Sequence, residues 1–264
     1  MTDEFFIIKS QETLFNGIEQ RWMEILHQQL KEVVYHGISF TRIAFISIYG
    51  SQNYHLAGPR SDIDSECFIF PAMDDLCFAK TPTSFKISTE YGDIYVKDIR
   101  LMFDELRKCS PNILELLASN YIWINKEYQY YILSILKNVD TFAKLNTYKL
   151  LKGLEGLVKR YCTPSTVSPK FIVNAARIKQ MIQRIINEEN FSSTLIPENA
   201  VVLFNNKYRN SEPDDLLKLT TIKIECNEIL SNYFNTHNSI FQPKIKELID
   251  ESQRALLMHY IHSI

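Results

Sequence analysis

Two aspartates with the spacing of a metal site lie in residues 62–70, a stretch whose alternating and then apolar pattern predicts a strand. Asp62 and Asp64 are two residues apart, so on a strand their carboxylates point to the same face. Two such charges repel unless a cation lies between them. Because Mg²⁺ binds carboxylate oxygens together with substrate phosphates, the pair predicts a divalent-cation site for Mg²⁺ or Mn²⁺.

A Gly-Ser pair precedes these aspartates at the end of an apolar, β-branched stretch over residues 42–49. Gly50 has no side chain to keep a phosphate from the backbone. Ser51 offers a hydroxyl and an N–H, and we expect it to begin a helix, whose positive end favours anions. The two pairs together predict a triphosphate cradle that faces a metal site. The alternative is a solvated strand start after a Gly-Pro turn, where Asp is common.

The stretch over residues 49–70 (YGSQNYHLAGPRSDIDSECFIF) resembles the Gly-Ser and Asp-x-Asp signature of the DNA polymerase β nucleotidyltransferase superfamily. Within that superfamily it looks most like the predicted nucleotidyltransferases associated with RNA repair, whose pattern reads approximately GS-x-AYGL-x-TP-x-SD-x-D. The matching positions are Gly50, Ser51, Tyr54, Leu56, Pro59, Ser61, Asp62 and Asp64, while His55, Gly58 and Arg60 depart from the pattern. Residues 110–117 (SPNILELL) and 170–177 (KFIVNAAR) extend the likeness.

The resemblance implies a nucleotidyltransferase that uses two Mg²⁺ or Mn²⁺ ions. An acceptor hydroxyl would attack the α-phosphate of a nucleoside triphosphate such as ATP and release pyrophosphate. Asp62 and Asp64 would hold both ions together with a third carboxylate. Asp93 is favoured for that role because it opens a predicted strand, whereas Asp98 has an alternative use as a helix cap. Glu66, on the face of Asp62 and Asp64, is a third candidate.

Four further polar residues are candidate contacts to the substrates. Arg60 and Ser61 could contact the triphosphate, although an Arg in a turn is more often simply exposed. Arg177 and Lys170, seven residues apart on a predicted helix, could guide a nucleotide or an RNA backbone. An RNA 3′ end is the favoured acceptor, with a protein hydroxyl or a small molecule as alternatives.

Secondary structure must position these residues, and the sequence pattern changes near residue 125 from mixed strands and helices to almost only helices. In the first part we expect a helix over 11–36 that ends at Gly37, strands over 42–49, 62–70, 84–90 and 94–97, and a helix capped by Asp98. In the second part we expect helices over 126–137, 141–161, 168–188, 214–235 and 243–260, with a loop over 205–215.

The expected fold is therefore α/β (α+β), a polymerase-β-like palm with a short mixed sheet over 1–125 and a helical domain over 126–264. One continuous domain, in which the helices wrap the sheet, is the alternative. Residues 126–180 hold ten Lys or Arg against three Asp or Glu in a chain of net charge -2, which is typical of a phosphate-facing surface or of a solvated helix face.

Cysteine spacing and hydropathy argue against disulfide-rich, zinc-binding, secreted and membrane-spanning proteins. The five cysteines are scattered without C-x-x-C spacing, so neither a disulfide framework nor a zinc site is indicated. Residues 1–9 place Asp3 and Glu4 before a short apolar run, unlike a signal peptide, and no apolar stretch is long enough to cross a membrane. We expect a cytoplasmic protein. The competing function is a non-catalytic nucleotide-binding or RNA-binding module, or an antitoxin-like one, that retains the fold.

Overall fold

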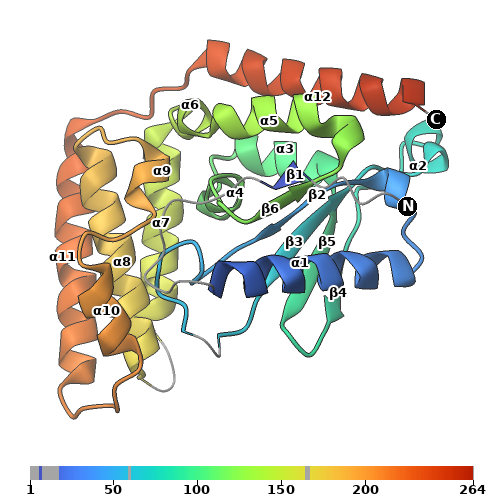
Figure 1. Cartoon of the computed structure of the whole chain (residues 1–264). Coiled ribbons are helices and arrows are strands. Elements are labelled where there is room, and N and C mark those ends of the chain that lie inside the picture. The colour runs from blue at the N-terminus through green and yellow to red at the C-terminus, as the bar shows by residue number, and fades with distance from the viewer. Residues whose placement is uncertain (1–5, 8–17, 59–60, 164–166, 264) are drawn as a thin grey trace.

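The computed structural model describes residues 6–7, 18–58, 61–163 and 167–263. It is a mixed α/β fold in which one twisted sheet is flanked by helices, with further helices beyond one end of the sheet (Figure 1). The strand order is β1-β6-β2-β3-β5-β4, where β3 and β5 are parallel and the other neighbours are antiparallel. The strands are β1 (Phe6–Ile7), β2 (Ile43–Ile48), β3 (Ser65–Ile69), β4 (Ser84–Ser88), β5 (Asp93–Asp98) and β6 (Ile122–Ile124).

The helices fall into three groups along the chain. The first part contains α1 (Ile18–Tyr35), α2 (Met73–Cys77), α3 (Ile99–Arg107) and α4 (Pro111–Leu117). The middle contains α5 (Gln129–Lys137), α6 (Val139–Ala143), α7 (Thr147–Tyr161), α8 (Pro169–Ile186), α9 (Phe191–Thr194) and α10 (Ala200–Lys207). The last are α11 (Asp215–Thr236) and α12 (Pro243–Ser263). Helices α7, α8 and α11 pack side by side, and α12 crosses over α3 and α5 (Figure 1). None of the described helices is long and apolar enough to cross a bilayer.

Each face of the sheet has its own apolar core. On one face, α1 packs Leu26 against strand residues such as Cys67. On the other face, Phe68 belongs to a larger cluster that also contains Phe103 of α3 and Ile178 of α8. This second cluster joins side chains from both sides of residue 125, and the division of the chain into 1–125 and 126–264 stays a prediction.

Most predicted elements of the described ranges are confirmed. Helix α1 ends where Gly37 takes a φ of +88°, which glycine adopts without strain; the start of this predicted helix, 11–17, lies outside the described residues. Asp98 caps α3, and its carboxylate accepts the Arg100 N–H at 2.9 Å. The turn-rich segment over 208–214 separates α10 from α11 as expected.

Three local predictions are corrected. Residues 51–55 form one hydrogen-bonded turn instead of a helix, because His55 takes a φ of +58° and the Leu56 N–H returns to the Ser51 carbonyl at 2.9 Å. Asp62 and Asp64 precede β3 instead of opening it. The predicted helix over 141–161 is two helices, because Asn146 caps the second one at the Lys149 N–H. The short elements α4 and β6 lie between the predicted ones.

Gly92, in the turn between β4 and β5, should tolerate no side chain. Its φ is +148°, and a Cβ atom there would lie 2.3 Å from the Ile63 carbonyl oxygen. We expect Gly92→Ala to lower the free energy of unfolding by about 2 kcal/mol or more, since neither backbone can move without breaking the sheet. Urea unfolding checks this, with Gly156→Ala as the control because its Cβ would meet nothing within 4 Å. Equal effects of the two substitutions would contradict the close approach.

Candidate functional site

A cavity of about 1110 Å³ separates the end of the sheet from helices of the second half of the chain. The Gly50–Ser51 turn and the segment with Asp62 and Asp64 line it from the sheet. Helices α7, α8 and α10 line it from the other side, with Arg160, Lys170 and Lys207 among their side chains. The residues singled out by the Gly-Ser and Asp-x-Asp pattern therefore share one cavity.

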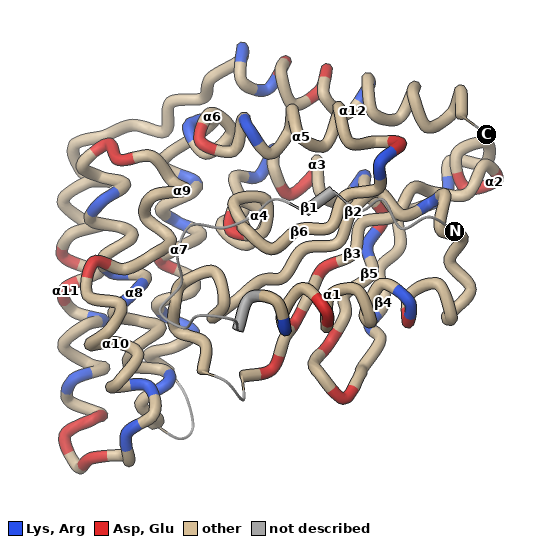
Figure 2. Tube along the Cα trace, viewed as in Figure 1, with Lys and Arg blue, Asp and Glu red and all other residues tan. Residues whose placement is uncertain are grey.

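Acidic side chains follow one another along the sheet wall of this cavity. Phe68 is buried in the core, Glu66 has 15% of its side chain exposed, Asp64 is half-buried and Asp62 is exposed. Figure 2 shows acidic positions along the trace near β3. From Phe68 to Asp62, the apolar core is thus followed by carboxylates that are increasingly exposed toward the cavity.

The three candidates for a third carboxylate have different surroundings. Asp93 and Asp64 lie just before the first paired residues of β5 and β3, and the Asp93 N–H donates to Asp64 Oδ1 at 3.0 Å. Its carboxylate accepts from Ser88 at 2.8 Å and pairs with Lys86 at 3.1 Å, and it does not line the cavity. Glu66 lines the cavity.

Asp98 is buried, and its carboxylate already has partners within the protein. Its carboxylate caps α3 and also pairs with the Arg100 guanidinium at 2.7 Å. Asp98 is not among the residues that line the cavity. A structural role therefore accounts for both carboxylate oxygens of Asp98.

The predicted metal ligands do not converge on one point in this structure. Within the described ranges, the only three His, Cys, Asp or Glu side chains whose ligand atoms all lie within 4.8 Å of one another are Glu212, Asp214 and Asp215. Arg209 pairs with Asp215, and Lys218 pairs with Glu212 at 2.7 Å. These cations account for the acidic cluster without a metal ion.

The Gly50–Ser51 turn is held by buried amides that the sequence pattern did not single out. Gly50 has a φ of +92°, a conformation that favours glycine. Gln52 donates its side-chain N–H to the Asp62 carbonyl at 2.7 Å, so the turn is tied directly to the aspartate segment. Asn53 donates to the Ile48 carbonyl at 3.0 Å and accepts from Ser119 at 2.8 Å. Both side chains are almost fully buried.

The helical wall of the cavity is basic. Arg160 and Lys170 are exposed, and Lys207 is half-buried. In the described part of the chain, none of the three has a carboxylate within 4.0 Å, whereas Lys152 and Lys159 of the same helical region both pair with Glu155. Figure 2 shows basic positions recurring along α7 and α8. Unpaired cations that face carboxylates across a cavity suit a ligand with both a polyanionic group and a bound cation.

Arg177 lies at this wall but is only 3% exposed. Its guanidinium donates to Glu115 at 3.0 Å and stacks on the Tyr54 ring, 3.5 Å from the ring centre. The Tyr54 hydroxyl donates to the other oxygen of Glu115. Burial raises the pKa of Tyr54, as does the neighbouring Glu115 carboxylate. The guanidinium predicted to bind nucleotide is thus occupied within the protein.

Arg60 and Ser61 were predicted to contact the triphosphate beside Asp62. Arg60 lies outside the described residues. Ser61 is described, and its hydroxyl accepts from the Gly58 N–H at 2.9 Å and contacts the Tyr208 hydroxyl at 3.0 Å. Tyr208 also accepts from the Gly58 N–H at 2.8 Å. Lys207 donates to the Leu56 carbonyl at 2.7 Å.

Lys207 and Tyr208 were missed by sequence reasoning. They join the end of α10 to the turn that precedes Asp62, and burial lowers the pKa of Lys207. In the sequence they stood out only as part of a polar, turn-rich stretch that begins near Asn205.

The Glu66–Lys97 pair should make the stability of the fold depend on pH. Burial raises the pKa of Glu66, and Lys97, 3.0 Å away, opposes that shift. In Lys97→Met the opposing charge is lost, so the pKa of Glu66 should rise further. A carboxyl with a raised folded-state pKa stabilises the fold below its unfolded pKa, and this stability is lost as pH rises through the folded value.

We therefore expect Lys97→Met to cost more stability at pH 7 than at pH 4.5, measured by urea unfolding at both values. In Lys97→Met with Glu66→Gln, this difference between the two pH values should become smaller, and the remainder reports on Glu105, which Lys97 contacts at 3.5 Å. A pH-independent cost in the single variant would show that Lys97 does not compensate the buried carboxylate.

No protein-family model matches the chain. No curated protein matches it either.

Proposed function

We propose that this protein is a Mg²⁺-dependent nucleotidyltransferase with a polymerase-β-like palm, which moves a nucleoside monophosphate from a triphosphate to an acceptor hydroxyl with release of pyrophosphate. One observation carries the proposal. Asp62 and Asp64 share a cavity with the Gly50–Ser51 turn and face unpaired cations, among them Lys170 and Lys207, on the opposite wall. Triphosphate chemistry uses both kinds of group, carboxylates to bind a metal ion and cations to bind phosphate oxygens.

Distant segments that carry the resemblance come together in space, which supports the proposal. Tyr54 follows the Gly-Ser pair, Glu115 lies in the SPNILELL stretch and Arg177 ends the KFIVNAAR stretch. The three side chains form one buried group at the cavity. A site built from the three stretches of the resemblance requires such a contact.

Two of the three predicted ligands are placed to receive a divalent cation. Asp62 and Asp64 line the cavity two positions apart on one wall, and neither has a cationic side chain within 4.0 Å among the described residues. These two residues would hold the ions together with Asp93, whose carboxylate would have to turn from Lys86 toward the cavity. The ions when bound would neutralise phosphate charge and lower the pKa of an acceptor hydroxyl.

The chain's own residues then orient the substrates. Gly50 and Ser51 line the cavity together with Asp62, and at Gly50 no side chain would keep a triphosphate from the main chain. Arg160, Lys170 and Lys207 would attract the phosphates and the acceptor. An RNA 3′ end is the acceptor that this basic wall suits best, because a polynucleotide extends beyond a single nucleotide and can contact several cations.

The test is incubation of the pure protein with each α-labelled nucleoside triphosphate, Mg²⁺ or Mn²⁺ and a total RNA pool. Label on RNA would establish transfer and identify the base, and label on protein would move the acceptor to a side chain. Binding is measured separately by thermal unfolding with each triphosphate, since a ligand at 100 times its dissociation constant stabilises by about 2.7 kcal/mol. If triphosphates stabilise the protein but no product carries label, the protein is a nucleotide-binding module and not an enzyme.

A further inference from the structure

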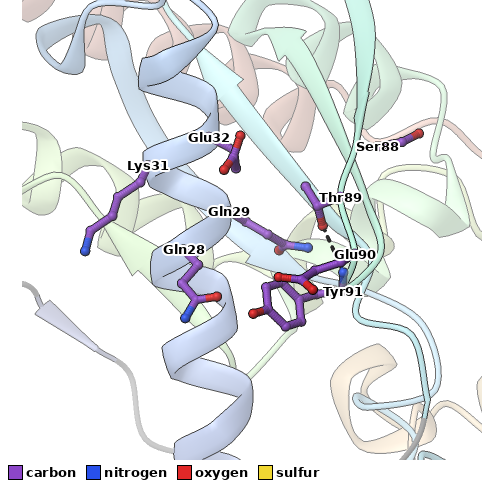
Figure 3. A pocket seen from close by; sticks show the side chains of 8 residues that line it. All are labelled: Gln28, Gln29, Lys31, Glu32, Ser88, Thr89, Glu90 and Tyr91. Atoms are coloured by element: carbon purple, nitrogen blue, oxygen red, sulfur yellow. Dashed lines mark hydrogen bonds between the residues drawn. The ribbon is translucent and has the colours of Figure 1, made fainter.

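A second cavity, of about 500 Å³, lies between α1 and the hairpin that joins β4 to β5 (Figure 3). Helix α1 covers the sheet face opposite to the one that carries Asp64 and Glu66. Nothing in the proposed transfer reaction uses this cavity. Its lining is polar and comes from four residues of α1 and four of the hairpin, which suits a small polar ligand.

Gln29 lines this cavity and contains a buried, unpaired acceptor. The residue is only 1% exposed, and its side-chain N–H donates to the Ile63 carbonyl at 2.7 Å. This bond fixes the orientation of the amide, so the oxygen is identified as Oε1. That oxygen is buried and has no hydrogen-bond partner among the described residues. Buried acceptors are nearly always paired in folded proteins, so a ligand with an N–H donor would satisfy Gln29.

The charges around Gln29 favour a cation. Glu32 and Glu90 line the cavity, and neither has a cationic side chain within 4.0 Å in the part of the chain that the structure describes. Lys31 also lines it, but Figure 3 shows its side chain pointing away from the hairpin. The same view shows Glu90 and Tyr91 directed toward Gln29. An aromatic ring beside carboxylates suits a planar cation.

We propose that this cavity binds a small organic cation of the guanidinium class. A guanidinium is planar, carries N–H donors in several directions and remains charged at neutral pH. One N–H would donate to Gln29 Oε1, while the charge would lie near Glu90 and Glu32. A simple ammonium lacks the planar fork, and a neutral amide lacks the charge.

The cavity is connected to the aspartate segment through Ile63, which lies between Asp62 and Asp64. The Ile63 N–H donates to the Tyr91 carbonyl at 2.8 Å, and its own carbonyl accepts from Gln29. Both backbone partners of Ile63 thus come from residues that line the second cavity. Binding of the cation does not depend on the proposed function, whereas a change of nucleotide affinity caused by that binding rests on it.

The test uses the full chain labelled with ¹⁵N, titrated with ethylguanidinium, ethylurea and tetramethylammonium. Ethylurea keeps N–H donors without the charge, and tetramethylammonium keeps the charge without the donors. We expect saturable shifts of the Gln29 side-chain amide signals with ethylguanidinium and at least about fivefold weaker binding of the other two. The absence of a saturable shift, or equal binding of all three compounds, would overturn the site.

Two variants separate the cavity from the rest of α1. Glu90→Gln should weaken ethylguanidinium binding about fivefold or more, while Glu24→Gln, an exposed carboxylate of the same helix outside the cavity, should not change it. Equal effects would show that only the general field attracts the cation. A capped Gly-Arg-Gly peptide should bind no more tightly than ethylguanidinium. Tighter binding of the peptide would show that the cavity recognises an arginine side chain of a peptide, and would overturn the proposal of a small-molecule ligand.

The functional arm measures the apparent affinity for the nucleoside triphosphate with and without saturating ethylguanidinium. A change that is absent in Glu90→Gln is expected from the contacts of Ile63. An unchanged affinity in the presence of bound cation would overturn the coupling. Because the NMR signals report binding directly, an inactive protein leaves the test of the cavity intact.

Discussion

Asp64→Asn is expected to reduce nucleotide transfer by about 10²–10³-fold or more while leaving the fold intact. The substitution removes a charge that a bound cation requires and changes almost no volume. The asparagine Oδ1 still accepts the Asp93 N–H, which is the contact that Asp64 makes in the folded chain at 3.0 Å. The measurement is the initial rate of pyrophosphate release, together with urea unfolding of the same preparation.

The matched control is Asp74→Asn, an exposed carboxylate on α2 outside the cavity. It should leave the rate unchanged. Equal rates for Asp64→Asn and the wild type would remove Asp64 from the reaction, and with it the proposed role of the aspartate pair.

The same assay decides between the candidates for the third carboxylate. The Asp93–Lys86 pair is exposed, with 33% and 48% of the two side chains accessible, and such pairs contribute about 0–1 kcal/mol. Asp93 can therefore turn to a cation at little cost. The Glu66–Lys97 pair is less exposed, at 15% and 19%, so releasing Glu66 would leave the half-buried Lys97 ammonium with only its longer contact to Glu105, at 3.5 Å. Asp93→Asn should cost more activity than Glu66→Gln, and the opposite ranking would make Glu66 the ligand.

Local chemistry explains which parts of the fold could be predicted from sequence. The strand over 42–49 is read from its β-branched and aromatic residues, and the helix after Asp98 from its cap, because both signals act within a few residues. The helix expected at Ser51 was wrong because a positive φ at His55, a non-glycine residue, ends the turn. The likeness to a motif does not reveal that backbone conformation.

The candidate site shows the same limit at longer range. Asp62, Asp64, Gly50 and Ser51 could be singled out because their order is a local pattern. Lys207 reaches the site from about 150 positions away, and its contact with the Leu56 carbonyl depends on how α10 packs on α8. Packing is set by the whole core, so no short window of sequence contains it.

Arg177 was predicted to guide a nucleotide or an RNA backbone, and its burial leads to the largest stability effect that we expect. Glu115→Ala should lower the free energy of unfolding by about 3–5 kcal/mol, because it leaves a guanidinium charged and unpaired in a site where only 3% of Arg177 is exposed. The guanidinium Nε already has no hydrogen-bond partner in the described structure, so little can replace the lost carboxylate. Urea unfolding without nucleotide measures the change.

The double variant Glu115→Leu with Arg177→Met separates the pair from its packing. Leu and Met keep much of the volume, and they remove both charges together, so no buried charge is left without a partner. We expect this variant to be more stable than Glu115→Ala and than Arg177→Met alone, with a coupling of about 1–3 kcal/mol in the cycle built on Glu115→Leu. Additive effects would mean that water reaches the guanidinium when Glu115 is removed. Arg177 would then be available to a phosphate from the cavity, and its predicted role in nucleotide binding would be restored.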